Sequence, residues 1–426
     1  MKKIFIRILG IVFIMLIWAG FVFWGTAEGL WHRAIAPQAT SQSFIEATEK
    51  EIGQQFVGNF AMATFRGGVV ECEKFQSAGK PVDRNTVFQV SSLSKWISAF
   101  GIMKLVEDGK LDLDAPVSKY LTRWKLPPSE FNNEEVTVRR LLSHTAGLTD
   151  GLGYSGFAAG TPTQSVEQSL TKASDADEGI SGAVRVGVKP GTEFKYSGGG
   201  YTLLQLLVEE VSGQSFSSFM RKSVFEPLGM EHSTYFWNDS SAYSLAEFYN
   251  SDGTKAEHYR YTSLAATSLY TSLSDLELFF QAHLEAKSMK GAEHHVIRPE
   301  TMKMMRKPHA RKMGLDVWGL GTILYAPTDH NDFIVGHDGK STPPINTAVR
   351  LNPVTGDGII ILATGNKTIA TKLASEWVFW KTGVVDTFLF PSLINGMIWA
   401  IVSGWIAMMM IIVFVRLRSR RRVRSC

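Results

Sequence analysis

The stretch that decides the fold of this 426-residue chain is Ser91-Ser92-Leu93-Ser94-Lys95-Trp96. It begins a strongly apolar run that continues to Val106 and ends near Gly109. A helix that is apolar on nearly all sides is a buried helix, and a glycine just after such a run is a typical helix end. The sequence therefore predicts a buried helix that starts at this stretch.

Ser92 and Lys95 are three residues apart, so their side chains share one face of the first helical turn and can touch. The N–H groups at a helix N-terminus favour developing negative charge there. A lysine in an apolar pocket loses part of its preference for the charged form and can act as a base. The motif thus combines a candidate nucleophile, a candidate base and backbone N–H groups that favour negative charge. Ser-x-x-Lys alone, however, is more often an N-cap serine and a solvated lysine.

Two uncharged apolar runs predict membrane spans near the two ends of the chain. One extends from Ile8 to Ala27 and the other from about Leu393 to Val415, and each is long enough to cross a bilayer as a helix. Tryptophans around the first run favour a retained anchor over a cleaved signal peptide. Because basic residues lie outside both runs, we expect a two-pass protein of the cell membrane with both termini in the cytoplasm.

These spans divide the chain into four parts. We expect a cytoplasmic tip, anchor and linker in 1–40, one extracytoplasmic domain in 41–383, a linker and second anchor in 384–415, and a basic cytoplasmic tail in 416–426. The net charge of +4 comes from that arginine-rich tail, so nothing indicates a nucleic-acid-binding body. No linker or repeat divides the central domain.

The central domain has strand patterns at both of its ends and helical patterns between them. Gly67-Gly68 predicts the turn of a hairpin, and Val87-Phe88-Gln89-Val90 predicts a short strand before Ser92. Further strands are expected at 320–325, 332–336, 347–351 and 358–364, and helices at 43–55, 205–211, 215–225, 274–286 and 370–380. This order predicts an α+β domain whose sheet combines both ends of the domain, which would also bring the two anchors together.

Five further short motifs follow Ser92 along the chain. They are KLDLDAPV (110–117), LLSHTAGL (141–148), KPGTEFKYS (189–197), PLGM (227–230) and GHDG (336–339). Together with Ser-x-x-Lys, this set resembles the serine β-lactamase and penicillin-binding protein superfamily, in particular its class C-like branch of esterases and D-aminopeptidases. The resemblance implies an antiparallel sheet flanked by helices, a helical subdomain, and an active site in the cleft between them.

The resemblance also implies roles for individual residues. Ser92 would be the acylated nucleophile and Lys95 its partner in proton transfer. Tyr196 would be driven towards phenolate by the nearby lysine and would relay the serine proton to the leaving group. The N–H groups of Ser92 and Lys340 would form the oxyanion hole. His144 is expected to shape a loop outside the chemistry.

Two departures from the family pattern affect the expected substrate. His337, in His337-Asp338-Gly339, takes the place of a family lysine, and Gly198 takes the place of an asparagine. The substrate cleft is still expected to be lined by His337, Gly339 and Gly198. The glycine run 198–200 predicts a bare cleft wall, without side chains, that admits bulky substrates. Because histidine carries little fixed charge at pH 7, these changes favour esters or D-amino-acid peptides over efficient β-lactam hydrolysis.

No nucleotide or metal cofactor is implied. The segment Glu293-His294-His295 lacks a third ligand at metal-site spacing. The expected partners are a small-molecule ester, peptide or β-lactam and the lipid bilayer, with no nucleic acid; protein partners are not indicated.

Three functions stay open from the sequence. The first is a membrane-anchored serine hydrolase that acts through a Ser92 acyl-enzyme on esters or D-amino-acid peptides. The second is a penicillin-binding protein or weak β-lactamase that acts on cell-wall peptides or β-lactams. The third is a binding or sensor protein with a hydrolase fold and little turnover.

Overall fold

An eight-stranded antiparallel sheet forms the centre of the protein, in the order β2-β1-β10-β9-β8-β7-β6-β5. The computed structural model describes residues 2–37, 40–53, 56–151, 153–237, 243–284 and 296–423. The strands are β1 Phe60–Arg66, β2 Val69–Gln76, β5 Ala310–Lys312, β6 Leu315–Trp318, β7 Ile323–Pro327, β8 Phe333–Ser341, β9 Ile345–Leu351 and β10 Gly358–Thr364. The predicted sheet from both ends of the domain is confirmed, because β1 pairs with β10. The segment Glu293-His294-His295 lies outside the described residues.

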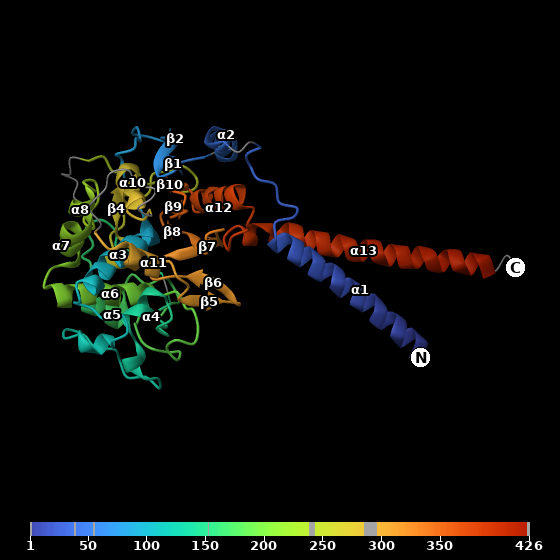
Figure 1. Ribbon diagram of the computed structural model, residues 1–426, viewed down its shortest axis with the longest axis horizontal. Helices are drawn as coiled ribbons and strands as arrows, with labels where there is room; N and C mark the ends of the chain where they lie inside the picture. The colour runs from blue at the N-terminus through green and yellow to red at the C-terminus, as the bar shows by residue number, and fades with distance from the viewer. Residues whose placement is uncertain are drawn as a thin grey trace.

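Both faces of this sheet are buried. Along β10, Ile360 and Leu362 belong to one apolar cluster, whereas Ile359 and Ile361 belong to another. This alternation is the two-residue period of a strand. The second cluster includes side chains of α2 (Ser41–Ile52) and α12 (Ile369–Thr382), and the first includes those of the remaining domain helices. Figure 1 shows these two groups of helices on the two sides of the sheet.

The first group contains most of the helices. They are α3 Ser94–Glu107, α4 Val138–Leu142, α5 Val166–Lys172, α6 Gly198–Ser212, α7 Phe216–Met220, α8 Glu226–Leu228, α9 Leu264–Thr267, α10 Leu273–Gln281 and α11 Pro299–Met305. A separate ribbon pairs β3 (Val87–Gln89) with β4 (Tyr270–Ser272). The α+β architecture with a flanked antiparallel sheet is therefore as predicted.

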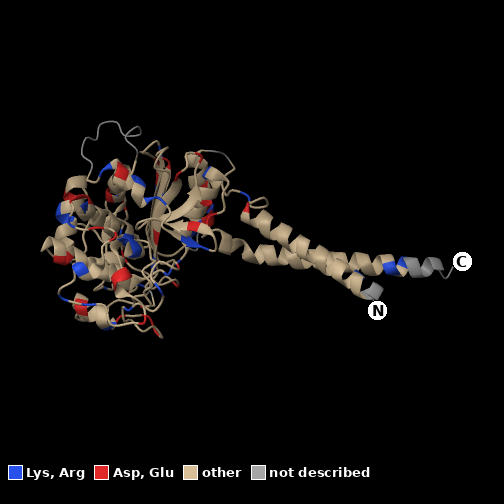
Figure 2. Ribbon diagram, turned by 60° about the horizontal axis from the view of Figure 1, so that its bottom comes forward, with Lys and Arg blue, Asp and Glu red and all other residues tan. Residues whose placement is uncertain are grey.

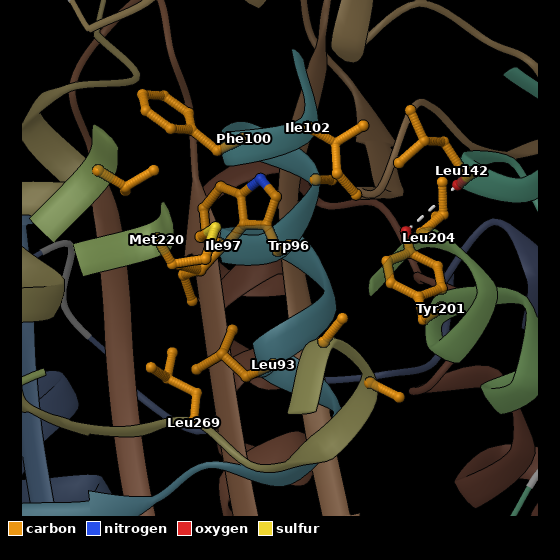
Figure 3. Packing of buried hydrophobic residues seen from close by; sticks show 14 of the residues in the cluster. Leu93, Trp96, Ile97, Phe100, Ile102, Leu142, Tyr201, Leu204, Met220 and Leu269 are labelled. Atoms are coloured by element: carbon orange, nitrogen blue, oxygen red, sulfur yellow. Dashed lines mark hydrogen bonds between the residues drawn. The ribbon is translucent and has the colours of Figure 1, made fainter. Parts of the chain in front are cut away.

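Helix α3 is buried along almost all of its length, as its composition predicts. Trp96 is 1% exposed and meets Phe279 edge to face, with ring centroids 5.0 Å apart. Figure 3 shows its side chains packed among those of neighbouring helices, including Met220 and Leu204. Helix α3 ends at Glu107, and Gly109 follows in the left-handed conformation. Burial of this kind stabilises the fold by about 1.5–3 kcal/mol for each large apolar side chain. The packing of α3 therefore fixes the position of its N-terminal end.

Helix α6 begins at Gly198, seven residues before its predicted start. The glycine run was expected to form a bare cleft wall, but Gly198, Gly199 and Gly200 are the buried first turn of this helix. Ser197 is the N-cap, and its hydroxyl accepts the N–H of Gly200 at 2.8 Å. An N-cap serine of this kind offsets the poor helix propensity of glycine.

Helices α1 (Lys2–Ala27) and α13 (Phe390–Val423) project together from one side of the domain (Figure 1). They pack against each other, since Trp18 Nε1 donates to the carbonyl of Ala400 at 3.2 Å and Trp405 Nε1 to that of Met15 at 3.0 Å. Figure 2 shows α13 without charged residues until basic residues appear near its end. Both helices are long and apolar enough to be candidate membrane spans.

Candidate active site

The turn that carries Ser92 is held in a strained conformation. Ser91–Leu93 form a 3₁₀ turn before α3, and Ser91 has a φ of 51°, in the left-handed region. The Ser91 hydroxyl donates to the carbonyl of Lys340 at 2.8 Å, and Thr347 Oγ1 donates to the carbonyl of Val90 at 2.9 Å. These bonds tie the turn to β8 and β9. Strain of this kind costs about 1–3 kcal/mol and is concentrated at functional sites.

Lys95 contacts Ser92, as the three-residue spacing predicts. Its Nζ donates to Ser92 Oγ at 3.3 Å and to the carbonyl of Ala266 at 2.8 Å. Lys95 is 2% exposed, and its Nζ lies 5.0 Å from the centre of the Tyr196 ring. Burial lowers the pKa of Lys95 to about 7, although Asp150 partly opposes this effect. A large fraction of Lys95 is therefore neutral near pH 7 and able to accept a proton.

The pKa of Tyr196 moves in the opposite direction from that of Lys95. Burial raises the pKa of its hydroxyl, an interaction with the Ser92 side chain partly lowers it, and the charge of Asp338 raises it further. Burial and the charge of Asp338 therefore disfavour the phenolate form that the sequence analysis expects for Tyr196. Burial thus moves the pKa values of the Lys95 amine and the Tyr196 phenol in opposite directions, and in both cases it favours the uncharged form.

His144 holds the backbone next to Tyr196. The N–H of Ser197 donates to His144 Nδ1 at 3.1 Å, so the ring proton is on Nε2. The His144 ring lies 4.3 Å from that of Tyr196, centroid to centroid, and burial keeps the His144 pKa well below its usual value. These contacts agree with the structural role expected for His144.

Asp150 is a site residue that the sequence analysis missed. It is 5% exposed; one carboxylate oxygen accepts the Ser197 hydroxyl and the other accepts the N–H of Gly199 at 2.8 Å. A Cβ atom at residue 199 would lie 2.9 Å from the Asp150 carboxyl carbon, so the glycine makes room for this carboxylate. The available signal was an acid just after LLSHTAGL together with glycines at a helix start.

A cavity of about 280 Å³ opens at the nucleophile. Ser92, Lys95 and Tyr196 line it together with Lys340. It also includes Gly153, Tyr154, Ser155, Asp177, Ser341, Thr342 and Lys367. The sequence motif thus places its three candidate catalytic side chains in one cavity.

His337, Gly339 and Gly198 do not line this cavity, so the prediction that they do is wrong. His337 is 1% exposed, and its ring lies 5.3 Å from that of Trp318; burial lowers its pKa to about 3. A Cβ atom at Gly339 would lie 2.1 Å from the carbonyl oxygen of Val90, so this glycine allows β8 to approach the segment before Ser92. Gly198 is buried in the first turn of α6.

A buried ion pair connects β8 to the neighbouring strand β9. Arg350 on β9 is fully buried, and its two terminal nitrogens each donate to Asp338 at 3.1 Å. The guanidinium carbon lies 3.5 Å from the centre of the Tyr325 ring. Arg350 Nε is 3.9 Å from a carboxylate oxygen of Asp386, the residue that accepts the N–H groups of Phe388 and Leu389 just before α13.

Comparison with known proteins places this domain in a family. The family model described as "Beta-lactamase" matches residues 44–377. Protein flp of Staphylococcus aureus (strain MRSA252) is 25% identical over 313 residues, which is 71% of this chain and 58% of that protein. This chain therefore spans less than two thirds of that relative's length.

Two solved structures have a similar fold. The octameric penicillin-binding protein homologue from Pyrococcus abyssi superimposes with a TM-score of 0.64 at 25% identity, covering 82% of this chain and 79% of the other. The structure of SurE with D-Leu gives a TM-score of 0.61 at 27% identity, covering 80% and 74%. Since the family match extends over nearly the whole domain that surrounds Ser92, this chain belongs to the β-lactamase family of serine hydrolases.

Proposed function

We propose that this protein is a membrane-anchored serine hydrolase that acts outside the cytoplasm through an acyl-enzyme on Ser92. The observation that carries the proposal is the contact of Ser92 Oγ with Lys95 Nζ, 3.3 Å away, where burial brings the pKa of that lysine to about 7. A base is most effective when its pKa is close to the working pH.

Neutral Lys95 takes the proton from Ser92 as Oγ attacks the substrate carbonyl. The N–H groups of Ser92 and Lys340 stabilise the oxyanion, and the bond from Ser91 Oγ to the carbonyl of Lys340 holds this peptide beside the nucleophile. The neutral hydroxyl of Tyr196 gives a proton to the leaving group, and the proton held by Lys95 replaces it. Water then attacks the acyl-enzyme, and the same groups return Ser92 to its starting state.

Esters and D-amino-acid peptides are the substrates we infer for this site. His337 is buried and supplies no charge to the cavity, and Gly198 supplies no amide side chain. A site of this kind lacks the motif lysine and the asparagine that would hold a β-lactam. The structural similarity to SurE with D-Leu supports a substrate built from D-amino acids.

Penicillin binding is the second candidate. The similarity to a penicillin-binding protein homologue favours it, and Lys340 and Lys367 at the cavity supply cations for a carboxylate. In this case β-lactams or cell-wall peptides would acylate Ser92, and the acyl-enzyme would be hydrolysed slowly.

The two long apolar helices would anchor the protein. In this arrangement α1 and α13 cross the cell membrane side by side, residues 1–40 and 384–415 contain the spans with their linkers, and 416–426 lie in the cytoplasm. The catalytic domain of 41–383 then lies outside. The contacts between α1 and α13, and their common direction in Figure 1, support this topology.

Hydrolysis of p-nitrophenyl acetate by the full chain in detergent tests the proposal. We expect Ser92→Ala to reduce turnover to the level of the buffer, and Tyr196→Phe to reduce kcat by about 10²-fold or more, because a positioned proton donor contributes about 10²–10⁴-fold. Tyr120→Phe is the matched control, because Tyr120 is half-buried and does not line the cavity. Turnover that persists in Ser92→Ala would refute the proposal, and full activity in Tyr196→Phe would refute the proton relay.

The pH dependence of kcat/KM should report Lys95. Below its pKa of about 7 the lysine is protonated and cannot accept the serine proton, so kcat/KM should fall tenfold per pH unit on the acid side. A pH series between 5 and 9 with a neutral ester measures this. A kcat/KM that stays level from pH 7 down to pH 5, as for a carboxylate base, would contradict the assignment.

A further inference from the structure

Three charged side chains line the cavity at Ser92, and no ion pair within the described residues includes any of them. Lys340 lies at the end of β8 and Lys367 in the loop before α12, where its Nζ donates to Thr342 Oγ1 at 3.0 Å. Asp177 lines the same cavity from another loop. Among the described residues, none of these three charged groups belongs to an ion pair.

The surroundings of Asp177 keep its carboxylate in place. Ser155 Oγ donates to Asp177 Oδ1 at 2.8 Å. A Cβ atom at Gly153 would lie 1.6 Å from Asp177 Oδ2, so the glycine leaves space that only this carboxylate uses. One hydroxyl does not satisfy an anion that can accept about four hydrogen bonds, which leaves room for a cationic donor.

A second, buried carboxylate interacts with Asp177 from outside the cavity lining. Asp175 is 5% exposed, and neither of its carboxylate oxygens has a hydrogen-bond partner in the described part of the chain. Burial, together with the charge of Asp177, raises the pKa of Asp175 to about 6. The two acids therefore interact, and a bound cation would relieve their repulsion.

The cationic and anionic groups lie close enough to act on one small molecule. Asp177, Lys340 and Lys367 all line this one cavity. The cavity volume of about 280 Å³ is just below the usual range for ligand pockets, about 300–1,000 Å³. Both facts favour a short substrate with charges of both signs.

We propose that the cavity selects a zwitterionic dipeptide, whose ammonium group faces Asp177, whose carboxylate faces Lys340 and Lys367, and whose peptide carbonyl lies at Ser92. In a dipeptide the scissile carbonyl lies between the two charged ends. The bond from Ser92 Oγ to that carbonyl carbon forms, the C–N bond breaks, and the leaving amine takes a proton. Water then releases the first amino acid. This inference rests on the proposed Ser92 hydrolase and names its substrate class.

The test compares four blocking states of one dipeptide with the full chain in detergent. Alanyl-alanine is used free, N-acetylated, C-amidated and doubly blocked, in D- and L-series, and loss of each dipeptide is measured by chromatography alongside p-nitrophenyl acetate hydrolysis. We expect kcat/KM to be highest for the free dipeptide, with at least a tenfold loss for each blocked end. Equal values for the four forms, or a loss on blocking only one end, would overturn the inference and leave the proposed hydrolase standing if the ester is still cleaved.

Two variants test which side chain contacts each charged end of the dipeptide. Asp177→Asn should reduce the preference for a free amine by about tenfold, and Lys367→Met should reduce the preference for a free carboxylate. Glu178→Gln is the control, because Glu178 is exposed beside Asp177 but does not line the cavity. If both preferences persist in the variants, the assigned contacts are wrong. Failure to cleave any of these substrates, including the ester, would count against the proposed function itself.

Discussion

Lys95→Met should nearly abolish hydrolysis while making the protein more stable. The substitution removes the base assigned to Ser92, and we expect kcat to fall by about 10²–10⁴-fold. Ester hydrolysis and thermal unfolding of the same preparation measure the two effects. They have one cause, because the burial that makes Lys95 a base also makes its charged form costly.

The gain in stability should depend on pH. Burial lowers the Lys95 pKa from 10.5 to about 7, which corresponds to a cost on the order of 5 kcal/mol for the charged form. Below pH 7 the folded state bears this cost in full. Between pH 7 and 10.5 the unfolded state binds more protons, so the stability of the parent protein rises with pH. The loss of the bond to Ala266 offsets about 1–3 kcal/mol.

We therefore expect Lys95→Met to unfold several degrees above the parent at pH 6, with the difference shrinking towards pH 10. Lys104→Met is the control on the same helix, where the lysine only pairs with Asp108 near the surface. It should change the melting temperature little at any pH. A lower melting temperature for Lys95→Met at pH 6, or retained turnover, would contradict this account of the base.

Arg350→Met should have the largest effect on stability. The substitution leaves Asp338 without its bidentate partner and leaves Asp386, fully buried, next to an apolar side chain. Removal of one partner from a buried ion pair costs about 3–5 kcal/mol. Burial raises the pKa of Asp386, and protonation of this carboxylate relieves its unpaired charge, so the loss measured by denaturant unfolding should be greater at pH 7.5 than at pH 5.

Arg311→Met is the matched control, since Arg311 pairs with Asp316 while its own side chain is 71% exposed. We expect a change within about 0.5 kcal/mol there. Arg350→Met combined with Asp338→Asn and Asp386→Asn should recover part of the lost stability. Equal effects of Arg350→Met and Arg311→Met would show that the buried pair does not hold β8.

The sequence predicts the parts of the fold that depend on local pattern. The apolar run after Ser92 predicts α3, and the strand patterns at both ends of the domain predict a shared sheet, which the pairing of β1 with β10 confirms. The spacing of Ser92 and Lys95 predicts their contact. The short strands β4, β5 and β6 were missed because three or four residues carry too little alternation to be recognised.

The rest of the site depends on tertiary contacts that local pattern does not contain. Gly198–Gly200 resemble a loop in sequence, but Asp150, from a distant segment, completes the helix start that they form. His337 occupies a motif position, yet Trp318 and the sheet bury it away from the cavity. Asp177 enters the cavity from a loop without any motif. Such residues become visible only once the chain is folded.

The central claim is an acyl-enzyme on Ser92, and intact-protein mass spectrometry tests it most directly. The full chain is mixed with a fluorophosphonate, with a slowly hydrolysed ester and, separately, with benzylpenicillin, each beside Ser92→Ala. The account predicts a fluorophosphonate adduct, and an ester adduct that forms and then decays, both mapped to Ser92 and absent from the variant. A stable penicillin adduct on Ser92 would favour the penicillin-binding candidate, and a stable ester adduct a sensor with little turnover. No adduct on Ser92 with any of the three reagents would contradict the account.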